Sequence, residues 1–420
     1  MINYNRLGYE IKRNLANFSE KVSNGLKQPQ SKFLLQMLYG ILAGNKLHLS
    51  EIARSLNENI TLKKTIDRLS RNLSAFKQKE TVMKNYISVV KKQINEENAV
   101  IVIDNSDITK PCSPKMEAIS DVRDGSTGEI RKGYFTVEAA VLSQNKKMPL
   151  PVYEKVFSAA EKGFISATHE NLQCLKLLSA HFSKNCVRTL DRGFDANDYY
   201  RYFLKNDEKF VIRSKKNRNV IYNGKTQNIM DVAGKYKGNY RMNFKDKHGK
   251  KIECKISYIP VRLCEFPNKV LVLVTVYGFG VQPMLLLTNL GVSEKKKLCM
   301  IATKVYLMLW RIEEYFKFKK QQFELEDLRV MSLQSIRNLN LVTGYIGMMS
   351  CEKEDTIFML ELKECSKRIF DIPKFIFYGL GYAIERVLAR THSGIKGFLL
   401  KKEQSQQLTL AECFAGLGFE

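Results

Sequence analysis

The spacing of apolar residues separates a helical N-terminal part of the chain from a central part in which strands and helices alternate. Between Phe33 and Leu42 the apolar residues recur three and four positions apart, which is the stripe expected on one face of an amphipathic helix. From Ala99 onward the pattern changes to short runs of β-branched residues with helical stretches between them. Strands that alternate with helices in this way predict an α/β domain.

The predicted strands of the central part differ in character along the chain. The first, 100–104, is apolar and ends in a carboxylate, and the strand 186–190 ends directly before Asp191. The stretch 215–283 is dense in Lys, Arg, Gly and Tyr and predicts a basic, mostly β insertion. One long helix is expected from about 295 to 320. The other predicted strands of the sheet cover 133–143, 149–157, 209–213 and 284–290.

A helix-turn-helix is one interpretation of residues 47–71. We expect Ser50 to cap a helix that is broken at Asn57, and Thr61 to cap a second helix. A basic second helix is typical of a motif that reads the major groove of DNA. A plain helical bundle with a solvated basic face fits the same pattern, so both interpretations stay open. The basic residues of the second helix are Lys63, Lys64, Arg68 and Arg71.

The charge balance indicates a polyanionic partner. The chain has 68 Lys and Arg residues against 43 Asp and Glu residues, a formal net charge of +25. A surface this basic attracts nucleic acid, because binding releases the counterions condensed on the phosphates. A protein kept soluble by Lys and a protein that binds an anionic membrane are the alternatives. No lipid-binding pattern accompanies the charge, so nucleic acid is favoured.

Cysteine usage and hydropathy predict a protein of the cytoplasm without a membrane partner. None of the nine Cys residues forms a Cys-x2-Cys pair, and only five His residues are present, which argues against a zinc finger. An odd, unpatterned Cys count suits reduced thiols. The polar N-terminus does not resemble a signal peptide. The longest apolar runs are shorter than the roughly 20 residues that a bilayer requires.

Three acidic residues are candidates for metal chemistry. Asp104 and Asp191 follow predicted strands, and Glu313 lies within the long predicted helix. Carboxylates at adjacent strand ends, joined by one from a nearby helix, can hold two divalent cations for phosphoryl transfer. Taken singly, each Asp also suits a turn, and Glu313 also suits an ion pair with Lys317 one helical turn later.

The predicted helix places a phenol, a carboxylate and an ammonium group on one face. Tyr306, Glu313 and Lys320 are spaced seven and seven residues apart, two helical turns each time. Glu314 is turned about 100° away from this face. The pattern Tyr306-x2-Leu309-x3-Glu313-x6-Lys320 resembles the Tyr-x2-Arg-x3-Glu-x6-Lys signature of a large family of bacterial insertion-sequence transposases. Further similarity to that family covers the runs 47–54, 103–107, 190–195, 209–215 and 286–290.

The resemblance implies a cut-and-paste DDE transposase with an RNase H-like mixed-sheet core, α/β in class. It implies that Asp104, Asp191 and Glu313 bind two Mg²⁺ ions, for which Mn²⁺ can substitute. The activity would be metal-dependent cleavage at transposon ends and strand transfer into target DNA. The implied partners are double-stranded DNA and a second copy in a synaptic homodimer, in a bacterial cytoplasm close to the nucleoid. Residues expected to contact DNA phosphates are Tyr306, Lys320, Arg192, Arg213, Lys215, Lys216 and Arg218.

Five regions follow from the patterns and the resemblance together. A helical DNA-binding region (1–95) precedes the first part of the catalytic core (96–214). The basic β insertion (215–283) is followed by the second part of the core with the glutamate helix (284–340). The helical C-terminal region (341–420) suits dimerisation or ordinary core packing equally well.

One position departs from the family signature. Leu309 stands where the signature has an Arg that is expected to contact phosphate near the glutamate. Arg311 does not replace it simply, because two residues onward lies about 200° around a helix. Another basic residue, such as Arg192, Arg213 or Lys215, would have to supply the contact. Otherwise the chain is an inactive relative that binds DNA as a repressor; a structure-specific nuclease with the same core is a further alternative.

Overall fold

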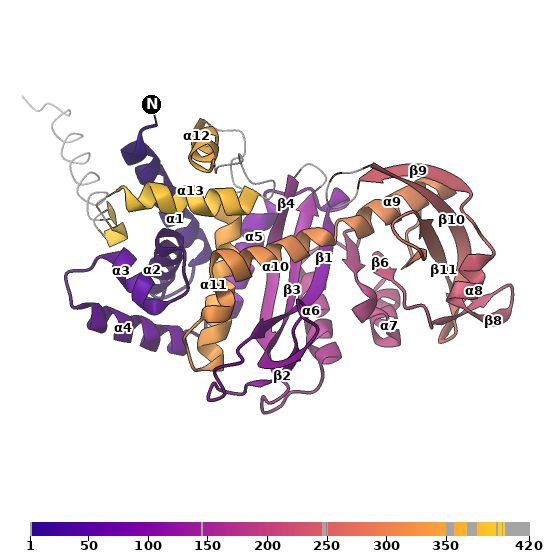
Figure 1. Cartoon of the computed structure of the whole chain (residues 1–420), viewed down its shortest axis with the longest axis horizontal. Coiled ribbons are helices and arrows are strands. Elements are labelled where there is room, and N and C mark those ends of the chain that lie inside the picture. Colours follow the sequence, from indigo (N-terminus) through magenta and orange to yellow (C-terminus); the bar gives the residue numbers. More distant parts are fainter. Residues whose placement is uncertain are drawn as a thin grey trace, which may run out of the picture.

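The molecule has a helical body at one end, a mixed sheet in the middle and the strands of the insertion at the other end (Figure 1). The computed structural model describes residues 2–143, 146–245, 249, 251–349, 357–367, 376–391, 394–396 and 398–399. The helical body begins with α1 (Tyr4–Val22), α2 (Gln28–Gly44), α3 (Leu49–Leu56), α4 (Leu62–Ala75) and α5 (Lys79–Lys91), followed by the 3-10 turn η1 (Glu96–Asn98). The apolar stripe predicted from Phe33 to Leu42 lies on α2, where both residues are buried.

The expected cap of α3 was wrong by two residues. His48 rather than Ser50 is the N-cap, and its ring Nε2 lies 2.9 Å from the backbone oxygen of Asp327, which holds this residue outside the helix. Asn57 ends α3 in the left-handed conformation that Asn tolerates, with φ 46°. Thr61 is the N-cap of α4, as expected, although its side chain makes no capping hydrogen bond.

The central strands form an RNase H-like sheet. Strand β3 (Ile130–Ser143) pairs antiparallel with β4 (Lys146–Phe157) and with β1 (Val100–Thr109), whereas β1, β5 (Val187–Leu190) and β6 (Phe210–Arg213) are parallel. This order of three antiparallel strands followed by two parallel ones confirms the predicted α/β fold class. The short strand β2 (Ser120–Arg123) is paired to β3.

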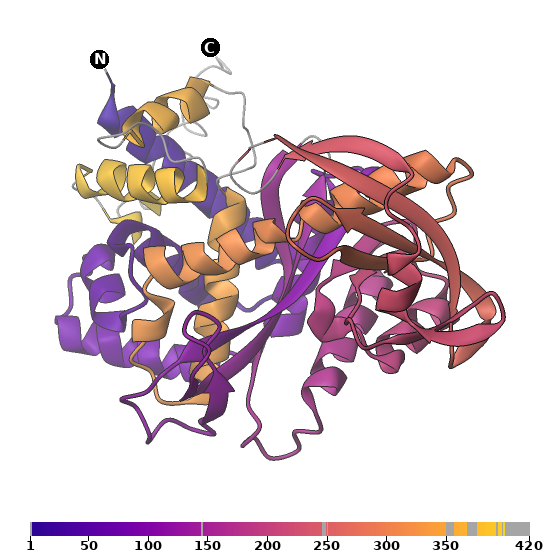
Figure 2. The ribbon, with the colours of Figure 1, turned by 45° about the vertical axis from the view of Figure 1, so that its right-hand side comes forward.

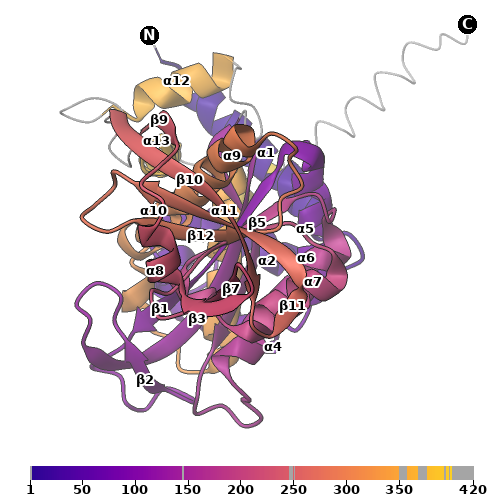
Figure 3. The same cartoon turned by 90° about the vertical axis from the view of Figure 1, so that its right-hand side faces the viewer.

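Helices cover both faces of this sheet. Glu154 on β4 accepts a hydrogen bond from Tyr315 of α10 (Trp310–Gln322), whereas the next residue, Lys155, pairs with Glu170 of α6 (Ala167–His181). Because successive side chains of a strand point to opposite faces, α10 and α6 lie on opposite sides. Figure 3 shows α10 on one side of the strands, with α6 and α7 (Asn197–Asn206) on the other.

The insertion extends the central sheet rather than forming a sheet of its own. Strand β12 (Met284–Thr288) pairs antiparallel with β6 on one side and with β11 on the other. In the described part of the chain the result is one continuous sheet of twelve strands. The 215–283 stretch supplies β7 (Asn219–Tyr222), β8 (Lys225–Asn228), α8 (Ile229–Gly234), β9 (Tyr240–Lys245), β10 (Lys251–Leu263) and β11 (Phe266–Tyr277).

The single long helix expected from about 295 to 320 was wrong. The structure has two helices, α9 (Lys295–Leu307) and α10, separated at Met308 and Leu309. The backbone N–H groups of these two residues bond to carbonyl oxygens three positions back, at 3.1 and 3.0 Å. This tight 3-10 turn interrupts the α-helical hydrogen bonds. The turn buries Leu309, whose side chain is 5% exposed.

The C-terminal helices pack against the N-terminal ones. After the 3-10 turn η3 (Leu325–Asp327), α11 (Leu333–Met349) contacts α2, α4 and β4, and α13 (Ile376–Ala389) contacts α1, α2 and α12 (Ile357–Cys365). Figure 2 shows the two groups of helices interleaved beside the sheet. Core packing therefore accounts for much of their apolar surface. Dimerisation stays a prediction, and residues 400–420 of the region assigned to it lie outside the described residues.

Among the described residues, no helix combines the length and apolar character needed to cross a membrane.

Candidate functional site

The two predicted aspartates are neighbours at the carboxyl ends of two parallel strands. Ile103 of β1 is opposite Leu190 of β5, so the residues that follow, Asp104 and Asp191, lie next to each other. Both side chains are partly buried. The backbone N–H of Asn105 donates a hydrogen bond to Asp104 Oδ1 at 2.8 Å. Strand pairing alone therefore brings two carboxylates together at one edge of the sheet.

Glu313 approaches this pair from α10. Burial, and then the negative charges of Asp191 and Glu313, raise the pKa of Asp104 to about 7. The Asn105 N–H acts in the opposite direction. Glu313 itself is exposed to solvent. Asp191 and Glu313 thus both lie within electrostatic reach of Asp104, and a cation beside Asp104 would favour its charged form.

Tyr306 forms hydrogen bonds with both Asp191 and Arg213. Its hydroxyl donates to Asp191 Oδ1 at 3.0 Å and accepts from Arg213 Nη1 at 3.2 Å. The same Arg213 atom lies 4.0 Å from Asp191 Oδ1. Burial, and then the charge of Asp191, raise the pKa of Tyr306 well above its ordinary value. The phenol therefore stays protonated and keeps donating to the aspartate.

Lys320 has partners of its own at the far end of α10. Its Nζ lies 2.9 Å from Asp107 Oδ2 and 3.1 Å from Glu326 Oε1. Burial alone would lower the pKa of Lys320, but the contacts with Asp107 and Glu326 raise it overall. Lys320 lies on the same side of α10 as Glu313, facing β1, and forms ion pairs with two carboxylates.

The other predicted phosphate-binding residues divide into two groups. Arg192, which follows β5, and Lys215 and Lys216, which follow β6, are exposed. Arg218 instead donates from Nε to Asp195 Oδ1 at 2.6 Å, and the Asp195 side chain is fully buried. Asp195 was missed as a structural residue; it follows Asp191 by four positions and organises the loop after β6 by also accepting hydrogen bonds from Tyr200, Ser214 and the Lys215 backbone.

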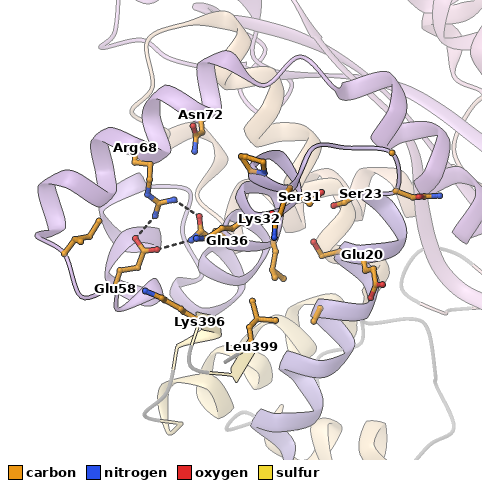
Figure 4. Close-up of a pocket in the computed structure, with 18 of the residues that line it drawn as sticks. Glu20, Ser23, Ser31, Lys32, Gln36, Glu58, Arg68, Asn72, Lys396 and Leu399 are labelled. Carbon is orange, nitrogen blue, oxygen red and sulfur yellow. Dashed lines mark hydrogen bonds and ion pairs between the residues drawn. The ribbon is translucent and has the colours of Figure 1, made fainter. Parts of the chain in front are cut away.

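The predicted helix-turn-helix residues divide in the same way. Lys63 and Lys64 are exposed on α4. Arg68 donates to Glu58 at 2.5 Å and to Gln36 at 2.7 Å, which braces α4 against the turn after α3 and against α2. This network lines a cavity of about 1240 Å³ between α1, α2 and α4 (Figure 4). Arg68 therefore has a structural partner, whereas Lys63 and Lys64 face solvent.

A buried set of charges behind the candidate site was also missed. Glu138 of β3 lies opposite Asp104 of β1, and Glu154 of β4 lies opposite Glu138, so three carboxylates form a row across the sheet. Lys319 of α10 lies 2.6 Å from Glu138 and is 1% exposed. The sequence signal was present, because Glu138 and Glu154 interrupt apolar strands. Strand register, which pattern alone did not fix, was needed to align them.

A second group of possible metal ligands lies elsewhere. His48, Glu324 and Asp327 offer ligand atoms within 4.8 Å of one another. Each already has a polar contact, because His48 Nε2 lies 2.9 Å from Asp327 Oδ2 and Glu324 lies 3.2 Å from Lys46. These contacts join the start of α3 to the turn after α10. They suffice to explain the group as a link between two parts of the chain.

The donor set of the candidate site fits a hard divalent cation. Asp104, Asp191 and Glu313 offer carboxylate oxygens, which Mg²⁺ and Mn²⁺ prefer. Burial is the main cause of the raised pKa of Asp104, and the charges of Asp191 and Glu313 add to it, so a bound cation would offset both effects. The residues present therefore suit the metal that the sequence predicted.

Comparisons with known proteins add little to this geometry. No model of a known protein family matches the chain, and no curated protein sequence matches it. Among solved structures, the chain is similar to a piggyBac transposase in a synaptic complex with hairpin DNA, at 11% identity and a TM-score of 0.40. That alignment covers 93% of this chain and 82% of the transposase chain.

Proposed function

We propose that this chain is a DDE transposase of the insertion-sequence type, which cleaves DNA at transposon ends and joins the freed ends to target DNA. The observation that carries the proposal is the meeting of Asp104 and Asp191 at paired strand ends of an RNase H-like sheet, with the charge of Glu313 acting on the same site. Such a constellation suits phosphoryl transfer on DNA, and the net charge of +25 suits the same substrate.

Asp104, Asp191 and Glu313 would hold two Mg²⁺ ions. Bound there, the metal would supply Lewis-acid stabilisation of charge on the reacting phosphate. Two residues of the chain, Tyr306 and Arg213, orient Asp191 and balance its charge. Tyr306 fixes the orientation of Asp191 through its hydrogen bond, and Arg213 compensates negative charge beside the same aspartate.

Arg213 is the best candidate for the cation that the family signature places at position 309. Leu309 is buried in the turn between α9 and α10, whereas the Arg213 side chain is 34% exposed and lies beside Asp191. A guanidinium in this place can bind a DNA phosphate near the metal site. We therefore assign to Arg213 the phosphate contact that Leu309 cannot make.

DNA would extend from this site along exposed basic residues. Arg192 follows β5, Lys215 and Lys216 follow β6, and Lys63 and Lys64 lie on the predicted recognition helix. A synaptic complex that holds two transposon ends requires two copies of the chain, so we expect a homodimer on DNA.

One observation favours a second candidate function, an inactive relative that represses by binding DNA. The arginine of the family signature is absent at Leu309. This candidate predicts tight binding of terminal-repeat DNA without any strand cleavage, whereas a nuclease of the same fold would cleave without joining ends.

A two-substrate assay separates the three candidates. Labelled duplexes carry the terminal repeat that flanks the coding sequence, one intact and one already cleaved at the repeat boundary, with a plasmid as target and Mg²⁺ present. A transposase cleaves the first and joins the second.

Asp191→Ala should abolish both reactions and leave repeat binding within about twofold. The matched control Asp198→Ala alters an exposed aspartate that pairs with Arg201 on α7, and it should retain both reactions. Cleavage by Asp191→Ala at the wild-type rate would overturn the site assignment.

A further inference from the structure

The carboxylate beside Asp104 is held by a buried lysine. Glu138 is directly opposite Asp104 in the antiparallel pair of β1 and β3, so both side chains point to the face covered by α10. Directly opposite residues have Cβ atoms about 5 Å apart, which is within reach of a shared cation. The charge of Glu138 also acts on Asp104, since it contributes to the raised pKa of that residue.

Lys319 occupies both oxygens of Glu138. Its Nζ donates to Glu138 Oε1 at 2.7 Å and to Oε2 at 2.6 Å, with a further bond to Asn340 Oδ1 at 3.0 Å. The side chains of Lys319 and Glu138 are 1% and 2% exposed. Each oxygen keeps a second lone pair, but the ammonium group fixes the orientation of the carboxylate and offsets the negative charge that would attract a metal ion.

The third member of the row does not compete for this lysine. Glu154 Oε1 lies 3.5 Å from Lys319 Nζ, which is farther than either Glu138 oxygen. Burial raises the pKa of Glu154 to about 8, although Lys319 lowers it, so the group is mostly neutral at pH 7. The 3.5 Å distance alone would fit an ion pair between Lys319 and Glu154, but burial favours a neutral Glu154 carboxyl group that accepts a hydrogen bond from Tyr315. Lys319 therefore compensates Glu138 above all.

We propose that Lys319 is a positioning residue for the metal site: by binding both oxygens of Glu138 it keeps this neighbouring carboxylate out of the site, so that Asp104, Asp191 and Glu313 alone meet the cation. The inference rests on the proposed function, because it presupposes a divalent cation at these three residues. It concerns the charge and ligand number of the site rather than the reaction itself.

The test measures Mn²⁺ binding to the full chain by calorimetry, with wild type, two single variants and the double variant forming a cycle. Lys319→Met removes the charge and keeps a similar volume, which releases Glu138. We expect this variant to bind Mn²⁺ about tenfold more tightly, because a fourth carboxylate joins the site. Glu138→Gln leaves the charge of Lys319 uncompensated and should weaken binding about tenfold. The double variant should return to within about twofold of wild type.

Two controls separate a positioning role from a structural one. Glu154→Gln alters the same row one strand farther from Asp104 and should leave Mn²⁺ affinity unchanged. Paramagnetic relaxation of water by bound Mn²⁺ should fall in Lys319→Met, since an added protein ligand displaces a water. If Lys319→Met does not fold, the comparison of Glu138→Gln with the double variant decides, and tighter binding by the double variant is expected.

The two proposals fail in different ways. Equal Mn²⁺ affinity in all folded variants, together with loss of binding in Asp104→Asn, would overturn the role of Lys319 and leave the metal site intact. Wild-type protein whose Mn²⁺ binding does not depend on Asp104 would overturn the proposed function, and the inference with it.

Discussion

The hydroxyl of Tyr306 donates to Asp191 Oδ1 at 3.0 Å while it accepts from Arg213 Nη1 at 3.2 Å. One phenol therefore joins the second aspartate of the candidate site to the nearest candidate phosphate-binding cation. The three residues come from α9, the end of β5 and the end of β6, so the contact exists only in the folded sheet.

Tyr306→Phe should slow strand cleavage roughly tenfold, because outer partners that orient a metal ligand typically contribute this much. The buried ring keeps its packing, so the fold and the affinity for DNA should change little. Single-turnover cleavage together with a binding titration measures both. Tyr202→Phe, which removes a hydroxyl that contacts Ser179 on α6, is the matched control. Equal rates for the two variants would show that the Asp191 contact has no role in the reaction.

Arg213→Gln should alter DNA binding and cleavage, whereas Arg218→Gln should alter stability. Loss of a phosphate contact at Arg213 should reduce the salt dependence of DNA binding by about one unit of slope and slow cleavage. Loss of Arg218 removes the partner of the buried Asp195 and should lower the free energy of unfolding by about 3 kcal/mol. Salt titration of binding and urea unfolding of both variants provide the measurements. A destabilised Arg213→Gln with an unchanged salt slope would contradict this division.

Leu309→Arg should not restore activity, although it restores the family signature. Leu309 is 5% exposed, and a guanidinium there would be buried at a cost of about 3 kcal/mol. We expect a lower melting temperature and cleavage no faster than wild type. A stable Leu309→Arg protein that cleaves DNA when wild type does not would instead support the inactive relative.

The stability of the protein should fall as the pH rises from about 5 to 8, in part because of Glu154. Burial raises the pKa of this carboxyl to about 8, above its ordinary value of 4.5, so the folded state binds a proton that the unfolded state has lost across this window. Stability from this group is thus greatest at low pH. Glu154→Gln should flatten the dependence between pH 5 and 8. Urea unfolding across that range measures the slope, and an unchanged slope would mean that Glu154 ionises normally. Lys79, whose pKa burial lowers to about 8, acts mainly above this window.

The sequence predicted the strands of the core and the candidate carboxylates because both depend on local patterns. Short apolar and β-branched runs identify strands, and Asp104 and Asp191 stand at the ends of such runs. The break between α9 and α10 was not predicted, because a 3-10 turn leaves the apolar spacing almost unchanged. The partners of Arg68 and Arg218 depend on side chains distant in the sequence, so both were predicted to contact DNA, and the buried Lys319 was not singled out at all.

The most direct test of the central claim is cleavage of the labelled terminal-repeat duplex by wild type, Glu313→Ala and Glu314→Ala, each with Mg²⁺ and with EDTA. Glu314 is the next residue on α10 and pairs with Lys317, so its variant controls for changes to the helix. We predict cuts at the repeat boundary that require Mg²⁺, disappear in Glu313→Ala and persist in Glu314→Ala. Tight binding of the duplex by wild type without any cut, or cleavage that survives in Glu313→Ala, would contradict the assignment of a DDE transposase.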